Sequence, residues 1–451
     1  MAFTEMMNKF HDLVWRERNR LLQATQNPSP RFRFAKNLPP ESKWLDRYAN
    51  VQPWANNRVK LQVPQGQQDY INASPIVLKS SLGDSESRPP LRYIAMQGPK
   101  FNSTSHVWRM VAEQLRSPAV IVMLTETHEG SFEKCYPYFP QSPDDPPLQV
   151  NENDDFGDGF RAIVRCAGIE ESAGGAIEAR RLEIDITIED RSDEDDLKTH
   201  AMGNDTEGQS PSQDQVQNGD TVPDIDIDAE VETETDQQEA KKSNGEAKRK
   251  RNVKIKERRT MTVWHLLYKR WPDFGVPDVS DMDSFFQLMS LSREKNAGQD
   301  NPRIIHCSAG VGRSGTFIAL EHLLQELASG DLENYDRDHG VVQSLGPNGG
   351  VGSVGPDLIY DTVNKLREQR RHMVQAESQY VFIYAVLRKL WMDKYGVSAT
   401  PIATNGPNQR NNGHGNSNGN GNGNGNGNGT GADEPAAKRL EVDPNDPFVE
   451  D

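Results

Sequence analysis

The chain has 451 residues, enough for one large domain or two ordinary ones, and apolar residues make up 34% of it. That share is below the usual globular value and predicts a folded core diluted by unfolded segments. Residues 191–240 hold sixteen Asp or Glu against two Lys or Arg, a balance of −14 within a total charge of −16. The remainder is nearly neutral, which excludes a nucleic-acid-binding domain, because such a domain needs a basic face.

Other features of composition exclude further classes of protein. No stretch approaches ~18 consecutive apolar residues, so we expect no transmembrane helix and no membrane contact. The start lacks the basic-then-apolar pattern of a secretion signal. The three cysteines, Cys135, Cys166 and Cys307, are too few and too far apart for a disulfide framework or a CxxC-type zinc site. These features predict a soluble cytoplasmic protein without a CxxC-type zinc site.

Taken in chain order, residues 1–30 read as an amphipathic helix that ends at "NPSP". Apolar runs and alternating patterns then predict strands at 70–78, 92–98, 119–127, 160–166, 180–189 and 253–268, with a helix at 104–116. Further helices are expected at 281–295, 314–329, 356–372 and 376–394. Strands that alternate with helices over one core predict an α/β fold with a mixed sheet.

Three segments lack the pattern of packed structure. The acidic insert, 191–250, is poor in aromatic residues and is predicted to be disordered inside a strand-to-strand connection. A glycine-rich loop at 337–355 is expected to be flexible. The tail, 398–451, contains a Gly-Asn repeat and is also predicted to be disordered. We therefore divide the chain into a helical segment 1–30, a folded domain 31–397 and this tail.

The stretch "RIIHCSAGVGRSGTFIAL", 303–320, carries the strongest chemical signal. Cys307 ends a strand and precedes a helix, and Arg313 follows six positions later. Small residues in between leave the backbone N–H groups room to form an anion cradle at the helix start. The same field favours a thiolate, and the arginine fork can hold two oxygens of a phosphate. We expect His306 to position the loop rather than act as a base. The cradle consists of Ser308, Ala309, Gly310, Val311 and Gly312.

Phosphoryl transfer also requires a general acid and an oriented water. Asp273 lies in "WPDFGVP", which has stiff ends and a flexible middle, as a closing lid needs. The same carboxylate can act as base in a second step, while Ser314 donates to the departing thiolate. Gln375 and Gln379, near the start of a helix, are the candidates for orienting the water.

These residues carry a resemblance to a known family. "HCSAGVGRSGT", "WPDFGVP", "MVQAESQY", "YIAMQGP" and "DRYANVQPW" together resemble the tyrosine-specific protein phosphatases, in the fungal cytoplasmic branch. The resemblance covers about 31–140 and 253–395, with the strands at 160–189. It implies a twisted mixed sheet flanked by helices on both faces and a cysteine-dependent phosphatase that uses no metal or cofactor.

The resemblance also implies a role for each matching position. Cys307 resembles the nucleophile, Arg313 the phosphate clamp and Asp273 the general acid, with Gln375 and Gln379 positioning water. Glu129 is similar to the carboxylate that orients the arginine, with Lys134 in the same loop. Further matches are the lid hinge Trp271, the aromatic wall Tyr48 and the substrate-contacting position Asn50. Asp46 stands where the family usually has Asn.

Several alternatives stay open on the sequence alone. A dual-specificity phosphatase and a catalytically silent phosphotyrosine-binding module are the competing functions. The basic run 241–251 reads as a nuclear import signal, a kinase-docking site or a counterweight to the acidic insert; 435–443 is a second import candidate. Cys135 and Cys166 read as buried small apolar residues rather than redox partners. The expected partners are phosphotyrosine proteins, with a signalling kinase as one candidate, and the expected state is a monomer.

Overall fold

The structure, a computed structural model, describes residues 2–82, 88–190, 254–272, 275–333, 342–345, 351–354 and 357–396. These residues lie within one compact unit, Met1–Ser398. The second unit, Ala399–Asp451, lies outside the described residues, as do 191–253. The disorder expected for the acidic insert and for the tail therefore stays a prediction, and so do the domain boundaries.

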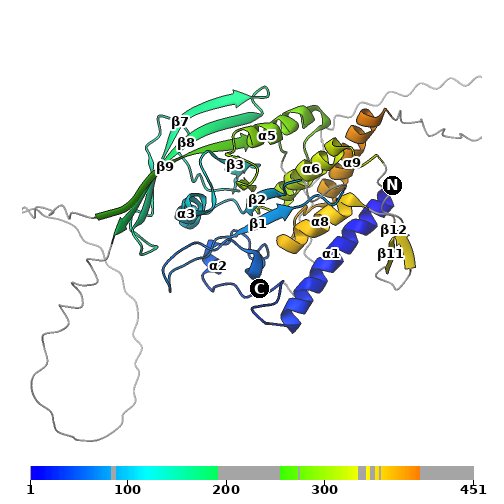
Figure 1. Ribbon diagram of the computed structural model, residues 1–451, viewed down its shortest axis with the longest axis horizontal. Helices are drawn as coiled ribbons and strands as arrows, with labels where there is room; N and C mark the ends of the chain where they lie inside the picture. The colour runs from blue at the N-terminus through cyan, green and yellow to red at the C-terminus, as the bar shows by residue number, and fades with distance from the viewer. Residues whose placement is uncertain are drawn as a thin grey trace, which may run out of the picture. The chain divides into compact units, whose positions relative to one another are not determined.

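Among the described residues, eight strands form one mixed sheet at the centre of the fold (Figure 1). β10 lies between β2 and β3 and is parallel to both, and β3 is parallel to β9. The other neighbouring pairs are antiparallel. In sheet order the strands are β1 (Ala73–Leu78), β2 (Leu91–Met96), β10 (Arg303–His306), β3 (Ala119–Met123), β9 (Lys254–Tyr268), β8 (Ile177–Asp190), β7 (Phe160–Ser172) and β6 (Leu148–Val150).

The sheet is buried on both faces, as its central sequences require. All five residues of β3 are buried, because Val120 and Val122 pack into one core and Ile121 and Met123 into the other. The helices on the Val120 side are α1 (Phe3–Gln26), α5 (Met282–Glu294), α6 (Gly312–Ser329), α8 (Leu358–Gln369) and α9 (Glu377–Tyr395). On the other side lies α3 (Thr104–Gln114). The predicted α/β class with helices on both faces is confirmed.

The parallel strands place several chain segments at one edge of the sheet. His306 at the end of β10 pairs with Met96 of β2 and Met123 of β3, and Met123 pairs with Leu267 near the end of β9. The segments after these strands therefore leave the sheet side by side. In α/β sheets this carboxyl edge is where ligands bind.

Some elements differ from the sequence-based expectation. The glycine-rich loop contains a short antiparallel pair, β11 (Val342–Leu345) and β12 (Val351–Val354), so the prediction of a plain flexible loop was incomplete. The hairpin of β4 (His128–Glu129) and β5 (Phe132–Glu133) was not predicted, because strands of two residues carry no readable alternation. Four helical elements were also missed, because segments of three or four residues are too short to show a helical period. These are the short helix α2 (Ser42–Leu45) and the 3-10 turns η1 (Ala55–Asn57), η2 (Phe101–Ser103) and η3 (Val279–Asp281).

The acidic insert joins two neighbouring antiparallel strands, as the sequence predicted. β8 and β9 pair over nearly their whole length, from Ile177 with Tyr268 to Asp190 with Lys254.

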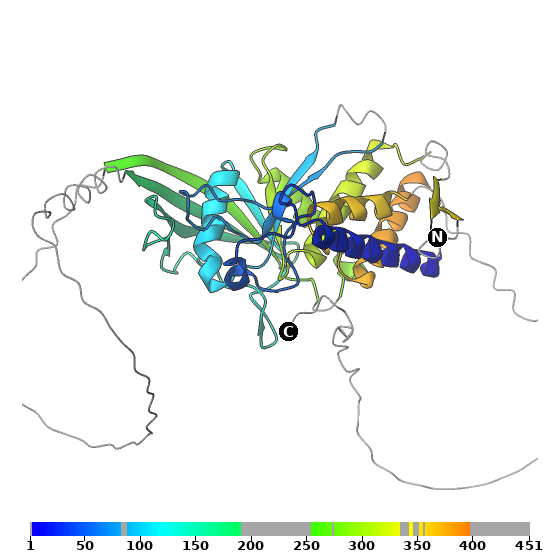
Figure 2. The ribbon, with the colours of Figure 1, turned by 90° about the horizontal axis from the view of Figure 1, so that it is seen from below.

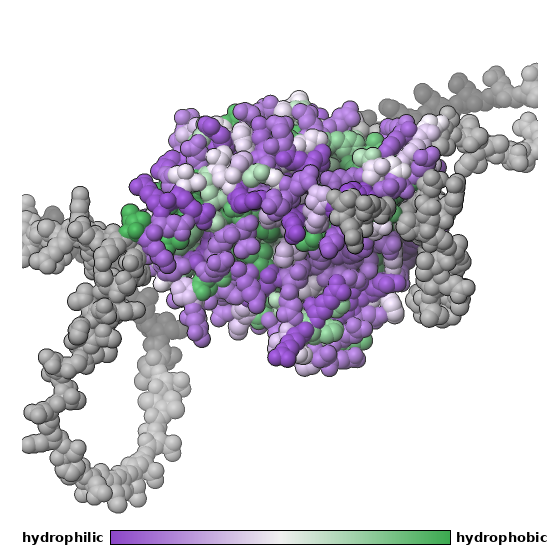
Figure 3. Space-filling model, in the orientation of Figure 1, coloured by the Kyte–Doolittle hydropathy of each residue, from purple (hydrophilic) through white to green (hydrophobic). Residues whose placement is uncertain are grey.

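The face drawn in Figure 3 is mainly hydrophilic, with apolar residues in small separate areas. No helix in the described ranges has the length and apolar character needed to cross a bilayer.

The N-terminal helix packs within the same unit rather than apart from it (Figure 2). Lys9 of α1 donates to Asp357 at the start of α8, with 2.7 Å between nitrogen and oxygen. Glu17 accepts from the ring Nδ1 of His372 at 2.7 Å and from the backbone N–H of the same residue at 2.9 Å. His372 has a φ of +62°, a strained value for a residue with a side chain, and this double contact with Glu17 offsets the strain.

Glu17→Gln should remove a charge on which this contact depends. Burial alone would raise the pKa of Glu17, but His372 and Arg367 together lower it from 4.5 to about 2. The ionised Glu17 carboxylate therefore contributes stability that is fully present above pH ~4.5 and is lost as the pH falls towards ~2. We expect Glu17→Gln to lower the free energy of unfolding by about 3 kcal/mol at pH 7, since each pKa unit corresponds to ~1.4 kcal/mol.

Urea unfolding of parent and variant at pH 7 and pH 3.5 measures this difference, which should shrink at the lower pH. Glu5→Gln, at an exposed position of the same helix, is the matched control and should leave stability within ~0.5 kcal/mol. An equal loss for both variants, or a difference independent of pH, would contradict this account.

Candidate active site

Cys307 lies directly after β10, at the carboxyl edge where the parallel strands end. Its side chain is buried, with 5% exposed. The sulfur accepts the backbone N–H of Gly310 at 3.3 Å and the hydroxyl of Ser314 at 3.4 Å. α6 begins at Gly312, so the positive end of the helix dipole also lies beside this sulfur. All three features favour a negative charge at this position.

The loop after Cys307 turns its carbonyl groups away from the sulfur. Arg370 donates from Nε to the carbonyl of Gly310 at 2.9 Å and from Nη2 to the carbonyl of Ala309 at 3.2 Å. The backbone N–H of Gly98 donates to the carbonyl of Ser308 at 2.7 Å. In a trans peptide the C=O and the following N–H point in opposite directions. Holding these three carbonyls therefore directs the next three N–H groups to the opposite side of the turn.

Gly310 is required at the centre of this loop. Its φ is +71°, and a Cβ built on it would lie 1.9 Å from the carbonyl oxygen of Met96. The backbone of Val374 packs against Gly315, one turn into α6, since a Cβ there would lie 2.4 Å from the Val374 nitrogen. Glycine thus allows the loop to rest directly on the end of β2 and on the segment before α9.

Arg313 lies in the first turn of α6, and its guanidinium is held by three other segments of the chain. Nη1 donates to the carboxylate of Glu129 on β4 and to the carbonyl of Leu124 at 3.1 Å; Nη2 donates to the carbonyl of Pro272 at 3.3 Å. Glu129 also accepts the hydroxyl of Thr125 at 2.8 Å and lies 3.4 Å from the ammonium of Lys134. The β4–β5 hairpin therefore orients the arginine.

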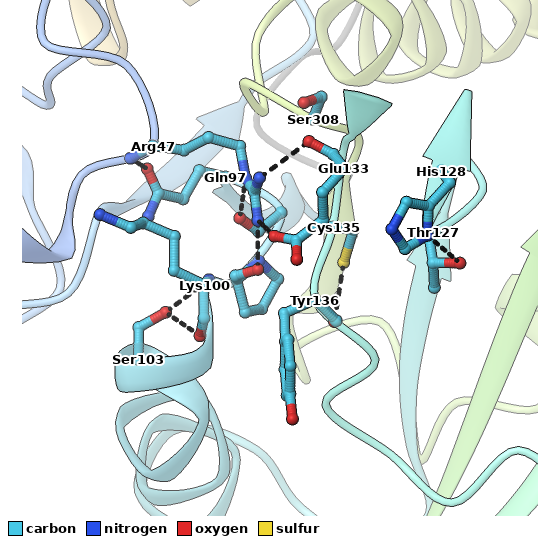
Figure 4. Close-up of polar contacts among 12 residues, drawn as sticks. Arg47, Gln97, Lys100, Ser103, Thr127, His128, Glu133, Cys135, Tyr136 and Ser308 are labelled. Atoms are coloured by element: carbon cyan, nitrogen blue, oxygen red, sulfur yellow. Dashed lines mark hydrogen bonds and ion pairs between the residues drawn. The ribbon is translucent and has the colours of Figure 1, made fainter. Parts of the chain in front are cut away.

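Tyr48 stands at the opposite side of the loop. Its hydroxyl oxygen is 2.7 Å from the Ser308 hydroxyl oxygen. Arg47, next to it, anchors this segment: its backbone N–H donates to Gln97 at 2.8 Å, Nε donates to the carbonyl of Gly98 at 2.9 Å and Nη1 to the carbonyl of Glu133 at 3.0 Å (Figure 4). The Tyr48 segment is thus tied to both β2 and the β4–β5 hairpin.

His306 is fully buried next to Cys307, and burial lowers its pKa to about 4, so the ring is neutral near pH 7. Nδ1 lies 3.3 Å from the carbonyl oxygen of Cys307, which can only accept, so Nδ1 carries the hydrogen. Nε2 then accepts from the hydroxyl of Tyr138 at 2.9 Å. Neither nitrogen is available to take a proton from the sulfur, which agrees with the positioning role expected for His306.

The lid is only partly described. Trp271 is buried, and its indole N–H donates to the carbonyl of Gly275 at 3.0 Å, which joins the two ends of the segment. Asp273 lies outside the described residues, and so does Phe274. The carbonyl of Pro272 nevertheless accepts from Arg313 at 3.3 Å, so the segment that carries Asp273 begins beside the first turn of α6.

The two glutamines lie next to the start of α6. A Cβ built on Gly312 would lie 3.0 Å from Nε2 of Gln379 and 3.5 Å from Oε1 of Gln375. Gln379 is buried and accepts the backbone N–H of Ala376 at 3.2 Å, whereas Gln375 is exposed. The structure therefore brings both amides to the loop, with the side chain of Gln375 facing solvent.

Not every predicted site residue lies with this group, and one residue of the site was not predicted. Asn50 is exposed, and its carbonyl accepts from Arg371 at 3.4 Å. Cys135 and Cys166 are buried, as expected for small apolar residues, and burial raises the pKa of Cys135 well above its usual value. Sequence reasoning missed Arg370, because only the fold brings this residue of the "REQRRH" run beneath a loop sixty positions earlier.

Comparisons with known proteins identify the family of this chain. A sequence model described as "Protein-tyrosine phosphatase" matches residues 43–158 and 217–389. The chain belongs to this family. The family assignment made from the motifs is confirmed, and so is the expected enzyme class.

Individual relatives of the chain are also phosphatases by name. The chain is 30% identical over 389 residues to tyrosine-protein phosphatase 1 of Saccharomyces cerevisiae, covering 86% of this chain and 94% of the relative. It is 26% identical over 381 residues to tyrosine-protein phosphatase 2 of Schizosaccharomyces pombe, covering 84% of this chain and 38% of that larger relative. It also matches human phosphatidylinositol phosphatase PTPRQ at 29% identity, over 79% of this chain and 10% of that protein.

Solved structures support the fold. The catalytic domain of human protein tyrosine phosphatase non-receptor type 18 has a TM-score of 0.51 and 21% identity, over 86% of this chain and 96% of that one. A complex of the same human phosphatase with HER2 phosphopeptides also has a TM-score of 0.51, at 20% identity, over 86% of this chain and 93% of that one. At these identities the likeness establishes the shared architecture.

Gly310→Ala should abolish oxyanion binding, because the added Cβ would lie 1.9 Å from a backbone oxygen that cannot move without shifting β2. Calorimetric titration with tungstate measures the effect. Gly330→Ala is the matched control: Gly330 also has a positive φ, +90°, but nothing lies within 4 Å of a Cβ there. The control should lose about 1–2 kcal/mol of stability and keep its tungstate affinity. Normal tungstate binding by Gly310→Ala would contradict the geometry described for the loop.

Proposed function

We propose that the chain hydrolyses phosphotyrosine in proteins through a cysteinyl-phosphate intermediate. The observation that supports this most directly is the sulfur of Cys307, which accepts hydrogen bonds from Gly310 and Ser314 at the start of α6. A thiolate at the centre of an anion-binding loop is a nucleophile already placed against the group that it attacks.

In the first step, the sulfur of Cys307 attacks phosphorus in line as the bond to the tyrosyl oxygen breaks. The guanidinium of Arg313 holds two of the equatorial oxygens, with its orientation set by Glu129 and, through Glu129, by Lys134. Asp273 gives its proton to the leaving oxygen, so that tyrosine departs as a neutral phenol. The hinge bond between Trp271 and Gly275 supports the closing movement that this transfer requires.

In the second step, water attacks the thiophosphate and the S–P bond breaks. Asp273, now ionised, takes a proton from the water, and inorganic phosphate leaves. Gln375, assisted by Gln379, orients the water, and their closeness to Gly312 supports this role. The hydroxyl of Ser314 stabilises the returning thiolate. Both steps balance without a metal or cofactor.

The wall formed by Tyr48 supports selection for phosphotyrosine. A deep slot lets the long phosphotyrosine side chain reach the sulfur and leaves phosphoserine and phosphothreonine short. The loop residues Ser308 to Gly312 bind the phosphate, and Asn50 at the rim contacts the substrate backbone. The human structural relative is solved with HER2 phosphopeptides, which supports phosphotyrosine proteins as substrates.

The cellular role proposed here rests on sequence features together with this activity. The chain opposes kinase signalling as a cytoplasmic monomer, with a phosphorylated kinase among its substrates. The basic runs are candidate signals for import into the nucleus, and the first of them is also a candidate kinase-docking site. The segments concerned, 241–251 and 435–443, lie outside the described residues.

Cys307→Ser is the direct test of the proposed activity. The parent should hydrolyse a phosphotyrosine peptide and leave the matching phosphothreonine peptide intact. The variant should lose turnover by on the order of 10⁴-fold or more, because a hydroxyl there is not ionised, and should still bind the phosphotyrosine peptide. Phosphate release and calorimetry measure the two effects. Cys166→Ser, at a buried cysteine far along the chain, is the control and should keep its activity.

Asp273→Ala tests the general acid. We expect kcat to fall by about 10²–10⁴-fold with KM little changed, because the proton transfer acts in the transition state and not on substrate binding. The basic limb of the pH profile of kcat should disappear in the variant. Turnover as fast as that of the parent would refute the assignment. The inactive variant also serves to capture physiological substrates from a lysate.

A further inference from the structure

The phosphate loop rests on a buried cation that has no direct counter-ion. Arg370 has 1% of its surface exposed, and its guanidinium donates to four neutral oxygens. These are the carbonyls of Ala309 and Gly310, the hydroxyl of Ser74 at 3.2 Å and the amide oxygen of Asn72 at 2.8 Å. Within the described part of the chain, no carboxylate forms an ion pair with Arg370. An uncompensated buried charge is costly, so a negative group nearby has a large effect.

Asp46 supplies that negative group, and the side-chain amide of Asn72 lies between it and Arg370. It is buried, with 6% exposed, and accepts the Tyr70 hydroxyl at 2.6 Å and the Asn72 amide N–H at 2.8 Å on one oxygen. The other oxygen accepts from Gln52 at 2.9 Å. Asn72 therefore bridges the two charges, since its N–H donates to Asp46 and its oxygen accepts from Arg370.

The titration behaviour of Arg370 agrees with this arrangement. Burial lowers its pKa from 12.5 to about 10, and the phenol of Tyr70, the sulfur of Cys307 and the carboxylate of Asp46 oppose that shift. The nearby cation Arg58 is already paired with Asp69, at 2.7 Å. Asp46 is thus the carboxylate that acts on the buried guanidinium.

We propose that Asp46 is a built-in counter-charge beneath the phosphate loop, which weakens the affinity of the site for oxyanions. Arg370, Arg313 and the start of α6 all add positive potential at the loop. A full negative charge among them reduces the hold on a bound anion, including the inorganic phosphate product. This inference rests on the proposed function in that it takes the loop to be the phosphate site.

The competing explanation is that Asp46 serves only as a hydrogen-bond acceptor. Asp46→Asn separates the two explanations, because one amide oxygen can still accept from Tyr70 and Asn72 while the charge is lost. Structural damage would weaken anion binding, whereas loss of a counter-charge would strengthen it. The sign of the change therefore decides between them.

The experiment is calorimetric titration of tungstate into the full chain in a Cys307→Ala background. We expect Asp46→Asn to lower the dissociation constant by at least about tenfold, because a unit charge within ~12 Å of the anion changes its binding by that factor or more at an effective dielectric of ~20. In the chain with Cys307 intact, the inhibition constant of inorganic phosphate should fall in parallel. An unchanged or weaker affinity would overturn the proposal.

Two controls isolate the charge at this position. Gln52→Ala removes the hydrogen bond to the second oxygen and leaves the charge, so tungstate affinity should stay at the parent value. Asp300→Asn removes an exposed charge whose partner is Arg116, and should also have no effect. A tenfold gain in either control would overturn the proposal.

A second variant guards against a failure to fold. Asp46→Ser is also neutral and keeps a hydroxyl acceptor for Tyr70, and must likewise bind tungstate more tightly. Circular dichroism establishes that each variant is folded before its affinity is measured. The proposed function has a separate outcome: absence of tungstate binding by the parent background would refute the phosphate site itself, whatever the variants do.

Discussion

The arrangement of the site depends on one interaction, the hydrogen bonds from Arg370 to the carbonyls of Ala309 and Gly310. Because a peptide is planar and trans, capturing an oxygen on one side sends the following N–H to the other. A buried guanidinium behind the loop thus creates a row of donors in front of it. The sulfur of Cys307 lies on that side and receives one of them.

The sheet supplies the constraint that makes this possible. β2, β10, β3 and β9 run parallel, and their ends are in register, so the segments that follow them meet at one edge. Each segment brings a different part of the site: Gly98 after β2, Cys307 after β10, Thr125 after β3 and Trp271 after β9. The antiparallel strands on either side lengthen the sheet. The acidic insert joins two of these flanking strands, so its length does not disturb the parallel core.

The charges around the loop form a balanced group rather than a single positive patch. Arg313 is held by Glu129, which also contacts Lys134, while Arg370 is linked through Asn72 to Asp46. One pair faces the substrate side and the other lies buried behind the loop. This balance is the basis of the product release proposed above.

The sequence by itself determined the local elements and the motifs from which the reacting groups are proposed. Apolar periodicity located the central strands and the helices to within a few residues, and Cys307, Arg313 and Asp273 stand in motifs whose residue types follow from the chemistry. Only the tertiary structure decided which groups lie beneath the loop. Arg370, Asn72 and Asp46 are far apart along the chain and meet only when β1, the Tyr48 segment and the segment before α9 pack together. Local patterns report backbone propensity and burial, whereas a buried charge finds its partner only in the folded core.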